Sequence, residues 1–352
     1  MKNKRNSNIE MLRIICMICI IIHHSFVHSG ITVYYDNILI EIIKVLGPIS
    51  NNIFILITGY YMVNYKTKKF NIIKLILETI FYSYSILIIN VLILKKVNSY
   101  MIIKSIFPIL TNSEWFITGY LLLYLSITII NRLLENISEK EHKKIIIFGI
   151  IVFSILPTIE LLNSYFSIYI WFIFLYIVGA FIGKYKEKYN ELIKKGWIVF
   201  LLSIINLVFI INQNKEDLIV GLGMNNIANF GVSLSVFMIF INKKQFCNDS
   251  INYIAASVLG VYLIHDNFIL RDIIWNKVKL LELYNTSNFW IYEICIVCLI
   301  FIVCILIDKL RIFIIEKPIM NKIDKIILNR KLKANVNDKR EKNVKIVSIE
   351  IK

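Results

Sequence analysis

The chain has 352 residues, 57% of them hydrophobic, with a mean hydropathy of +0.68 and a formal net charge of +16. A soluble domain does not reach this apolar fraction while carrying many uninterrupted runs of Ile, Leu, Val and Phe, because its surface cannot shield them from water. The basic residues form short clusters between the apolar runs, which is typical of the loops of a membrane protein and not of a nucleic-acid-binding domain.

Ten apolar segments predict an all-α integral membrane protein with about ten transmembrane helices. Each segment approaches or reaches the ~20 residues that cross the hydrocarbon core of a bilayer. The seventh and eighth are the shortest. In chain order the segments are 9–28, 45–63, 72–94, 115–134, 145–162, 166–183, 197–212, 227–242, 251–273 and 289–315.

The first segment resembles a signal peptide at its start, because the basic stretch 1–5 precedes an apolar run. The run itself contains Glu10 and Arg13, and no small-residue cleavage site follows it. We therefore expect a first transmembrane helix that is retained in the mature protein.

The distribution of Lys and Arg predicts that both termini are cytoplasmic. With the N-terminus inside, the cytoplasmic segments before the tail hold 18 basic residues and the opposite segments hold 7. This asymmetry is the one that cytoplasmic loops show. We expect a polytopic membrane domain over residues 1–316 and a basic cytoplasmic tail over 317–352, solvated and partly disordered near anionic lipid.

Polar residues form a stripe along the predicted first helix. At 100° per residue, Glu10, Arg13, His24 and His28 fall within an arc of about 60°, whereas His23 points about 100° away from His24. Ionisable groups inside a bilayer are costly and mark function. Interfacial anchoring explains Glu10, Arg13 and His28 equally well, but it does not explain His24, which lies deep in the segment.

The predicted ninth helix carries a second histidine, His265, followed by Asp266. His24 and His265 both lie roughly 20 Å from the cytoplasmic ends of their helices, so they can face one cavity. The alternative is that His265 and Asp266 mark the outer membrane interface.

The predicted second helix carries Asn51 and Asn52 towards its outer end and Thr58, Gly59 and Tyr60 towards its inner end. Gly59 has two interpretations. It belongs to a functional motif, or it lets a neighbouring helix approach closely.

Five of the six cysteines lie in apolar runs, and they include the C-x-x-C pairs Cys16/Cys19 and Cys295/Cys298. No His or Asp partners complete a zinc pattern around these pairs. We expect these cysteines to serve as small buried hydrophobic side chains. The sequence predicts no metal site.

These polar residues resemble the motifs of the membrane acyltransferase 3 family. Arg13, ten residues and then His24 match its Arg-x10-His pattern, although the doublet with His23 makes this assignment depend on spacing. Thr58-Gly59-Tyr60 resembles its Ser-Gly-Tyr/Phe segment, with Thr replacing Ser. The resemblance covers roughly residues 7–320, and it includes the segments 260–265, 114–116 and 175–179.

The resemblance implies O-acylation of a cell-envelope sugar or polysaccharide, with acyl-CoA, usually acetyl-CoA, as the donor substrate and no bound cofactor. It implies a multi-pass protein of a bacterial plasma membrane, with membrane lipid and no nucleic acid as a partner. His24 is expected as general base or as carrier of the acyl group. The other expected site residues are His265 (catalytic), Arg13, Thr58, Gly59 and Tyr60 (donor-binding), and Glu10, Asn51, Asn52, Tyr262 and Asp266 (supporting).

The competing hypothesis is a polysaccharide or lipid transporter without chemistry. A transporter also needs intramembrane polar groups, and Glu78 in the third segment suits a proton relay. Against it, the sequence shows no repeat of its two halves and no paired broken helices.

Overall fold

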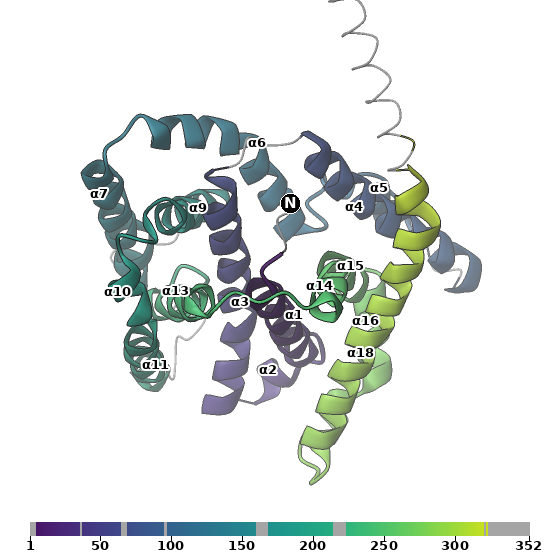
Figure 1. Ribbon diagram of the computed structural model, residues 1–352. Helices are drawn as coiled ribbons and strands as arrows, with labels where there is room; N and C mark the ends of the chain where they lie inside the picture. The colour runs from purple at the N-terminus through teal and green to yellow at the C-terminus, as the bar shows by residue number, and fades with distance from the viewer. Residues whose placement is uncertain are drawn as a thin grey trace, which may run out of the picture. The chain divides into compact units, whose positions relative to one another are not determined.

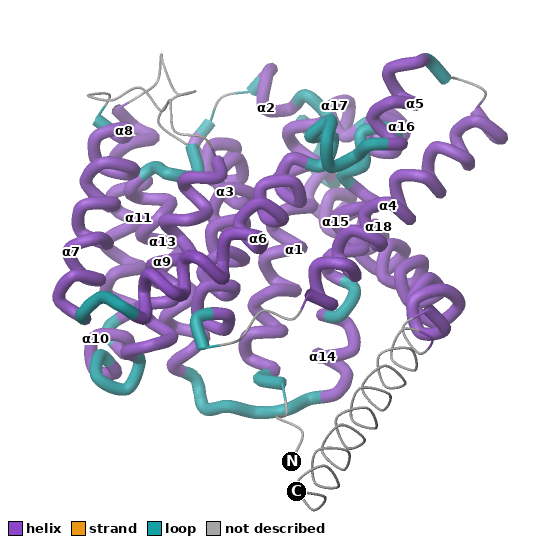
Figure 2. The backbone as a smooth tube through the Cα atoms, turned by 90° about the horizontal axis from the view of Figure 1, so that it is seen from above, coloured by secondary structure: helices purple, strands orange, loops and turns teal. Residues whose placement is uncertain are grey.

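The computed structural model describes residues 5–35, 37–64, 69–94, 97–159, 168–213, 223–319 and 322. These residues form helices and loops and contain no strand (Figure 2), which confirms the all-α prediction. The chain divides into two compact units, Met1–Cys304 and Ile305–Lys352. The helix packing and the site described below concern the first unit, and most of the predicted tail lies outside the described residues.

Six helices among the described residues are long and apolar enough to cross a membrane, and a bent pair of helices raises the number to seven. Each of the ten predicted segments contains helix among its described residues, but the count of ten stays a prediction. The six are α1 (Ser7–His28), α3 (Ile38–Met62), α4 (Lys69–Ile89) with the π-helical turn Asn90–Leu94, α6 (Trp115–Glu135), α9 (Ile168–Tyr185) and α18 (Phe289–Arg311).

The remaining predicted segments form shorter or interrupted helices. Segment 145–162 is divided between α7 (Glu139–Ile150), a π-helical turn (Ile151–Ile155) and α8 (Leu156–Thr158), and α7 begins with a charged turn. Short helices fill the connections. The other described helices are α2 (Ile31–Tyr34), α5 (Ser99–Ile106), α10 (Asn190–Lys194), α11 (Gly196–Gln213) and α13 (Ile227–Asn242).

Helix α3 is the centre of the first unit, where it packs between α1 and α9 and also contacts α13 (Figure 1). Its contact with α9 is the closest of these. A Cβ atom added to Gly59 would lie 2.3 Å from the carbonyl oxygen of Tyr176, and one added to Gly179 would lie 2.3 Å from that of Leu56. The two backbones approach so closely because glycine stands on both sides of the contact.

Buried amides fasten these helices together. Asn52 on α3 donates from Nδ2 to the carbonyl oxygen of Met224 at 2.8 Å, and its Oδ1 accepts from Trp171 Nε1 at 2.9 Å. Asn52 is fully buried, and a buried amide is stable only when its donors and acceptors have partners. The side chain thus joins α3 to α9 and to the loop before α13.

Two lysines close the ends of other helices. Lys184 Nζ donates to the carbonyl oxygen of Leu134 at 2.9 Å, near the end of α6. Lys186 Nζ donates to that of Ile241 at 2.8 Å, near the end of α13. The last carbonyls of a helix have no partner within the helix, so these ammonium groups satisfy them.

The predicted ninth helix, 251–273, is wrong as a single helix. The chain instead forms α14 (Asp249–Ala255), α15 (Val258–His265), α16 (Leu270–Val278) and α17 (Leu280–Leu283), with a bend of 84° between Asp249–His265 and Leu270–Leu283. Asn267 Oδ1 accepts from the backbone N–H of Ile269 at 3.0 Å. This local bond competes with helical bonding, so the break leaves His265 as the last residue of α15.

Candidate active site

Two cavities follow each other along α1. The Arg13 cavity, of about 390 Å³, is lined by the α1 side chains from Ile9 to Ile20. The His24 cavity, of about 480 Å³, is lined by those from Ile20 to His28. Ile20, Asn51 and Tyr262 line both cavities. The polar stripe predicted on α1 therefore faces both spaces, and α3 and α15 contribute to the wall between them.

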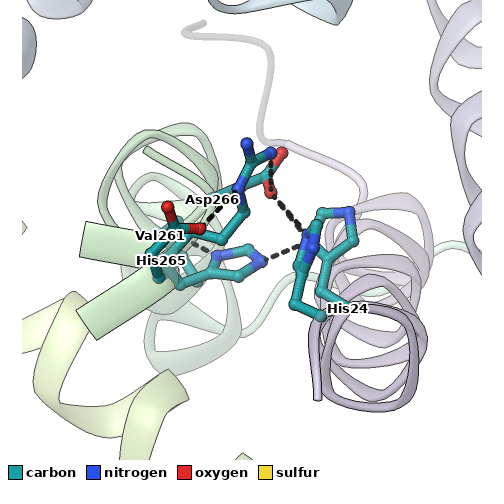
Figure 3. Close-up of polar contacts among 7 residues, drawn as sticks. His24, Val261, His265 and Asp266 are labelled. Atoms are coloured by element: carbon teal, nitrogen blue, oxygen red, sulfur yellow. Dashed lines mark hydrogen bonds and ion pairs between the residues drawn. The ribbon is translucent and has the colours of Figure 1, made fainter. Parts of the chain in front are cut away.

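The predicted histidine pair exists, and its hydrogen bonds define the proton positions (Figure 3). His265 Nδ1 lies 2.7 Å from the carbonyl oxygen of Val261, and His265 Nε2 lies 3.0 Å from His24 Nδ1. A carbonyl oxygen only accepts, so neutral His265 carries its proton on Nδ1 and accepts through Nε2. His24 must then donate from Nδ1, which leaves a lone pair on His24 Nε2.

Asp266 completes this cluster. Its Oδ1 lies 3.5 Å from His24 Nδ1, 3.3 Å from His28 Nε2 and 3.9 Å from Arg271 Nη1. The carboxylate is buried, so it stabilises positive charge on its neighbours more strongly than it would in water. Asp266 is placed to stabilise His24 when that ring takes up a proton.

The two adjacent histidines diverge as the helical angles predict. His23 Nδ1 lies 3.4 Å from the carbonyl oxygen of Ile43 on α3, and its ring packs against Gly47, where an added Cβ would lie 2.6 Å from the ring. His23 also lines the His24 cavity. His24 alone of the two bonds to α15.

The Arg13 cavity holds a mixture of charges. Arg13 Nη1 pairs with Glu10 Oε2 at 3.0 Å, one turn away on α1, and both side chains line the cavity together with Thr58. Thr58 Oγ1 donates to the carbonyl oxygen of Phe54 at 2.9 Å. Lys74 and Glu78 of α4 also line this cavity.

Four predicted site residues are not among those that line either cavity, and one of them is His265, which bonds to His24 instead. Gly59 faces α9 in the close helix contact. Of its two interpretations, the structure therefore supports close helix packing. The Tyr60 ring packs on Tyr61 and Phe237, and Tyr61 lines the Arg13 cavity in its place. Asn52 is the amide that joins α3 to α9.

The His24 cavity also contains residues that the sequence interpretation did not assign to the site: His28, Arg271, Trp115 and Trp171. His28 was interpreted as an interfacial anchor. Arg271 was a detectable signal, because a charged residue inside a predicted membrane segment is costly. No pattern in the sequence indicated Trp171, which comes from α9.

Glu114 lies directly before α6 and is buried. Burial, and then the negative charge of Asp266, raise the pKa of the Glu114 carboxyl well above its usual value, while Arg271 lowers it. Burial therefore disfavours the charged form of this carboxyl.

A family model described as an acyltransferase domain matches residues 6–309. That range contains every cavity-lining residue named above. Comparisons with curated proteins and with solved structures gave no match. Because the family model covers most of the sequence and the described residues form a bundle of apolar helices, the chain is a multi-pass membrane protein that belongs to the acyltransferase 3 family.

Proposed function

We propose that this protein transfers an acyl group, acetyl in the first instance, from acyl-CoA to a hydroxyl of a cell-envelope sugar or polysaccharide, with His24 as general base. The observation that carries the proposal is the hydrogen-bond chain from Val261 through His265 to His24. This chain holds the His24 ring and leaves Nε2 unprotonated at the wall of a cavity of about 480 Å³.

The proposed reaction takes place beside His24. The acceptor hydroxyl gives its proton to His24 Nε2 as its oxygen attacks the thioester carbonyl carbon. The tetrahedral intermediate collapses, the C–S bond breaks, and the CoA sulfur takes the proton back from His24. Asp266 stabilises the imidazolium between these steps, as its 3.5 Å distance from His24 Nδ1 allows.

The Arg13 cavity is the proposed donor site. A guanidinium has five N–H donors and binds phosphate well, and the contact with Glu10 engages one nitrogen of Arg13. Arg13 and His24 are separated by about 16 Å of helical rise. An extended pantetheine arm would run along α1 and bring the thioester to the shared wall of the two cavities.

Tyr262 and Asn51 are proposed to act at that wall. Both line both cavities, so they lie where the thioester carbonyl would meet the acceptor. A tyrosine O–H or an amide N–H can stabilise the oxyanion of the tetrahedral intermediate.

The acceptor would occupy the His24 cavity, whose aromatic wall includes Trp115 and Trp171. Indole rings offer flat apolar surface together with an N–H donor, which suits the mixed polarity of a sugar ring.

The proposal includes ten spans and cytoplasmic termini in a bacterial plasma membrane. A reporter fused after Lys195 should accordingly report the cytoplasm.

The test is acyl transfer by two adjacent histidine variants, His24→Ala and His23→Ala, purified at matched levels and supplied with acetyl-CoA and envelope glycan. His24→Ala should lose ~10²-fold or more of the rate, as expected for loss of a general base. His23→Ala should lose far less, since His23 bonds to Ile43 and not to α15. Equal rates in both variants, or a loss only in His23→Ala, would refute the assignment.

A covalent route is the variant mechanism, in which His24 itself receives the acyl group before the hydroxyl attacks. Wild-type protein mixed with labelled acetyl-CoA but no acceptor distinguishes the two routes. Label on a peptide containing His24 supports the covalent route, and its absence in an active preparation supports direct transfer.

One observation favours a transporter. Two cavities share a wall beside the break between α15 and α16, and broken helices often build transport sites. Glu78 lines one of these cavities. The same assay separates the two functions, because a transporter neither hydrolyses acetyl-CoA nor acetylates an acceptor.

A further inference from the structure

The cluster beside α15 has a second chemical capacity. We propose that His24, His28 and Asp266 form a binding site for a divalent cation of the zinc type, and that occupation of this site blocks His24 as a base. The first part stands without the proposed function, and the second part rests on it. The sequence analysis predicted no metal site, because no His or Asp partners complete a zinc pattern around the two cysteine pairs.

The distances fit a tetrahedral cation. Zinc lies about 2.0–2.2 Å from imidazole nitrogen and carboxylate oxygen, so two of its ligand atoms lie about 3.4 Å apart. Asp266 Oδ1 lies 3.5 Å from His24 Nδ1 and 3.3 Å from His28 Nε2. One ligand atom from each of the three residues lies within 4.8 Å of the other two.

The scaffold holds these ligands in place. His24 and His28 are four residues apart on α1, so their rings stand one above the other on a single face, with centroids 5.1 Å apart. Asp266 follows the last residue of α15, and its backbone N–H donates to the carbonyl oxygen of Tyr262 at 3.1 Å. The metal ligands therefore come from two helix ends that the fold already brings together.

The site would keep a coordination position for water or an oxygen ligand. All three residues line the His24 cavity, so a bound cation would face that space. Two neutral imidazoles and one carboxylate are a ligand set that zinc accepts. Arg271 Nη1, 3.9 Å from Asp266 Oδ1, is a positive neighbour of the same carboxylate oxygen.

Metal binding conflicts with base catalysis at His24. The cation needs the lone pair of His24 Nδ1, the atom that donates to His265 Nε2 at 3.0 Å. The proton then moves to Nε2, and an Nε2–H group cannot accept a proton from the acceptor hydroxyl. His265 keeps its bond to Val261 and loses the one to His24.

Binding is measured first, without donor or acceptor. Full-length protein in detergent is stripped with a chelator, titrated with Zn²⁺ against a chromogenic competitor, and loaded with Co²⁺ to record the absorption of a tetrahedral site. We expect one ion per chain. The His28→Ala and Asp266→Asn variants should bind about tenfold more weakly or worse, and His23→Ala should bind as the wild type does.

Each outcome decides the first part. Equal zinc affinity in wild type, His28→Ala and Asp266→Asn would overturn the site, and so would no stoichiometric ion in wild type. His28→Ala removes a whole ring and can leave a void, whereas Asp266→Asn keeps nearly the same side-chain volume. If His28→Ala fails to fold, Asp266→Asn remains as the test. Elution as a single species in size-exclusion chromatography is the folding control for every variant.

The second part is tested on wild-type protein alone. Acyl transfer should fall in proportion to zinc occupancy and return fully when the chelator is added. If acyl transfer is unchanged or faster at full zinc occupancy, zinc does not block His24 as a base, and only the cation site itself remains supported. A preparation that binds zinc but transfers no acyl group under any metal condition counts against the proposed function and not against the cation site.

Discussion

The contact between α3 and α9 and the contact between α1 and α15 show two opposite ways of joining helices. In the first, Gly59 and Gly179 bring two backbones together without space for a Cβ atom. In the second, the rings of His24 and His265 meet at a hydrogen bond and a cavity lies beside them. The first contact leaves no space for a ligand, and the second leaves a cavity in which the proposed chemistry would take place.

The largest effect should come from breaking the scaffold contact. Gly179→Leu would push side-chain atoms into the carbonyl of Leu56, so α3 and α9 must separate. Overpacking of this kind costs about 3 kcal/mol or more when backbone blocks the space. We expect little monodisperse protein and a lower unfolding temperature.

The matched control for this change is Gly119→Ala on α6, whose new Cβ would lie 3.1 Å from an edge atom of the Phe172 ring. A side-chain ring can shift where a backbone cannot, so this variant should stay folded. If the Gly179→Leu protein is as stable as the Gly119→Ala protein, α3 and α9 can separate at little cost, and the close contact at Gly179 is not needed for stability.

The second largest effect concerns Arg13, near the N-terminal end of α1. Arg13→Ala should raise the apparent KM for acyl-CoA by about tenfold or more, since hydrogen bonds to a charged group contribute about 1.5–3 kcal/mol. The rate at saturating donor should change little. Initial rates across a donor titration separate these parameters, and a fall in kcat at constant KM would place Arg13 in the chemical step.

A smaller effect should follow from removing the acceptor of the His24 hydrogen bond. His265→Ala removes the acceptor 3.0 Å from His24 Nδ1 and leaves Asp266 Oδ1 at 3.5 Å. An ordinary hydrogen bond contributes about 1 kcal/mol, which is about fivefold in rate. We expect kcat to fall while the donor KM stays constant. If His265→Ala is as damaging as His24→Ala, His265 takes part in proton transfer and is more than a positioning residue.

The smallest effect should come from the surface of the scaffold, where Lys188 Nζ bonds to Glu139 Oε2 at 2.7 Å. The bond to Lys188 lowers the Glu139 pKa below its usual 4.5. A lowered folded-state pKa stabilises the protein above that usual value, and the contribution is lost as the pH falls through the lowered one. Between pH 7 and pH 4 the wild type should therefore lose slightly more thermal stability than Glu139→Gln. An identical loss in both would show that the pair contributes nothing.

The sequence was sufficient to predict the stripe on α1 because one helix determines it. Arg13, His24 and His28 lie on one face by angle alone, and they line the two cavities in order. The separation of His23 from His24 follows from the same arithmetic. Similar depth indicated that His24 and His265 could face one cavity, since helices that cross one bilayer share a length scale; the two rings do meet, but only His24 lines the cavity.

The remaining features depend on contacts that a single segment does not determine. The break after His265 accompanies a bond in which the Asn267 side chain accepts from the backbone N–H of Ile269, and an apolar window average does not detect one such bond. Gly59 fits a catalytic motif and a packing motif equally well until α9 is in place. The contribution of Trp171 to the His24 cavity depends on how α9 lies against α3.

The lysines at the end of α9 have a consequence for how charge is interpreted as topology. Lys184 and Lys186 belong to the basic cluster that indicates the cytoplasmic side, and each also holds the last turn of another helix through a backbone carbonyl. Part of the positive bias at this edge is therefore architectural. Neutralising either lysine would weaken the orientation signal during insertion and, in the finished protein, would free a helix end to fray.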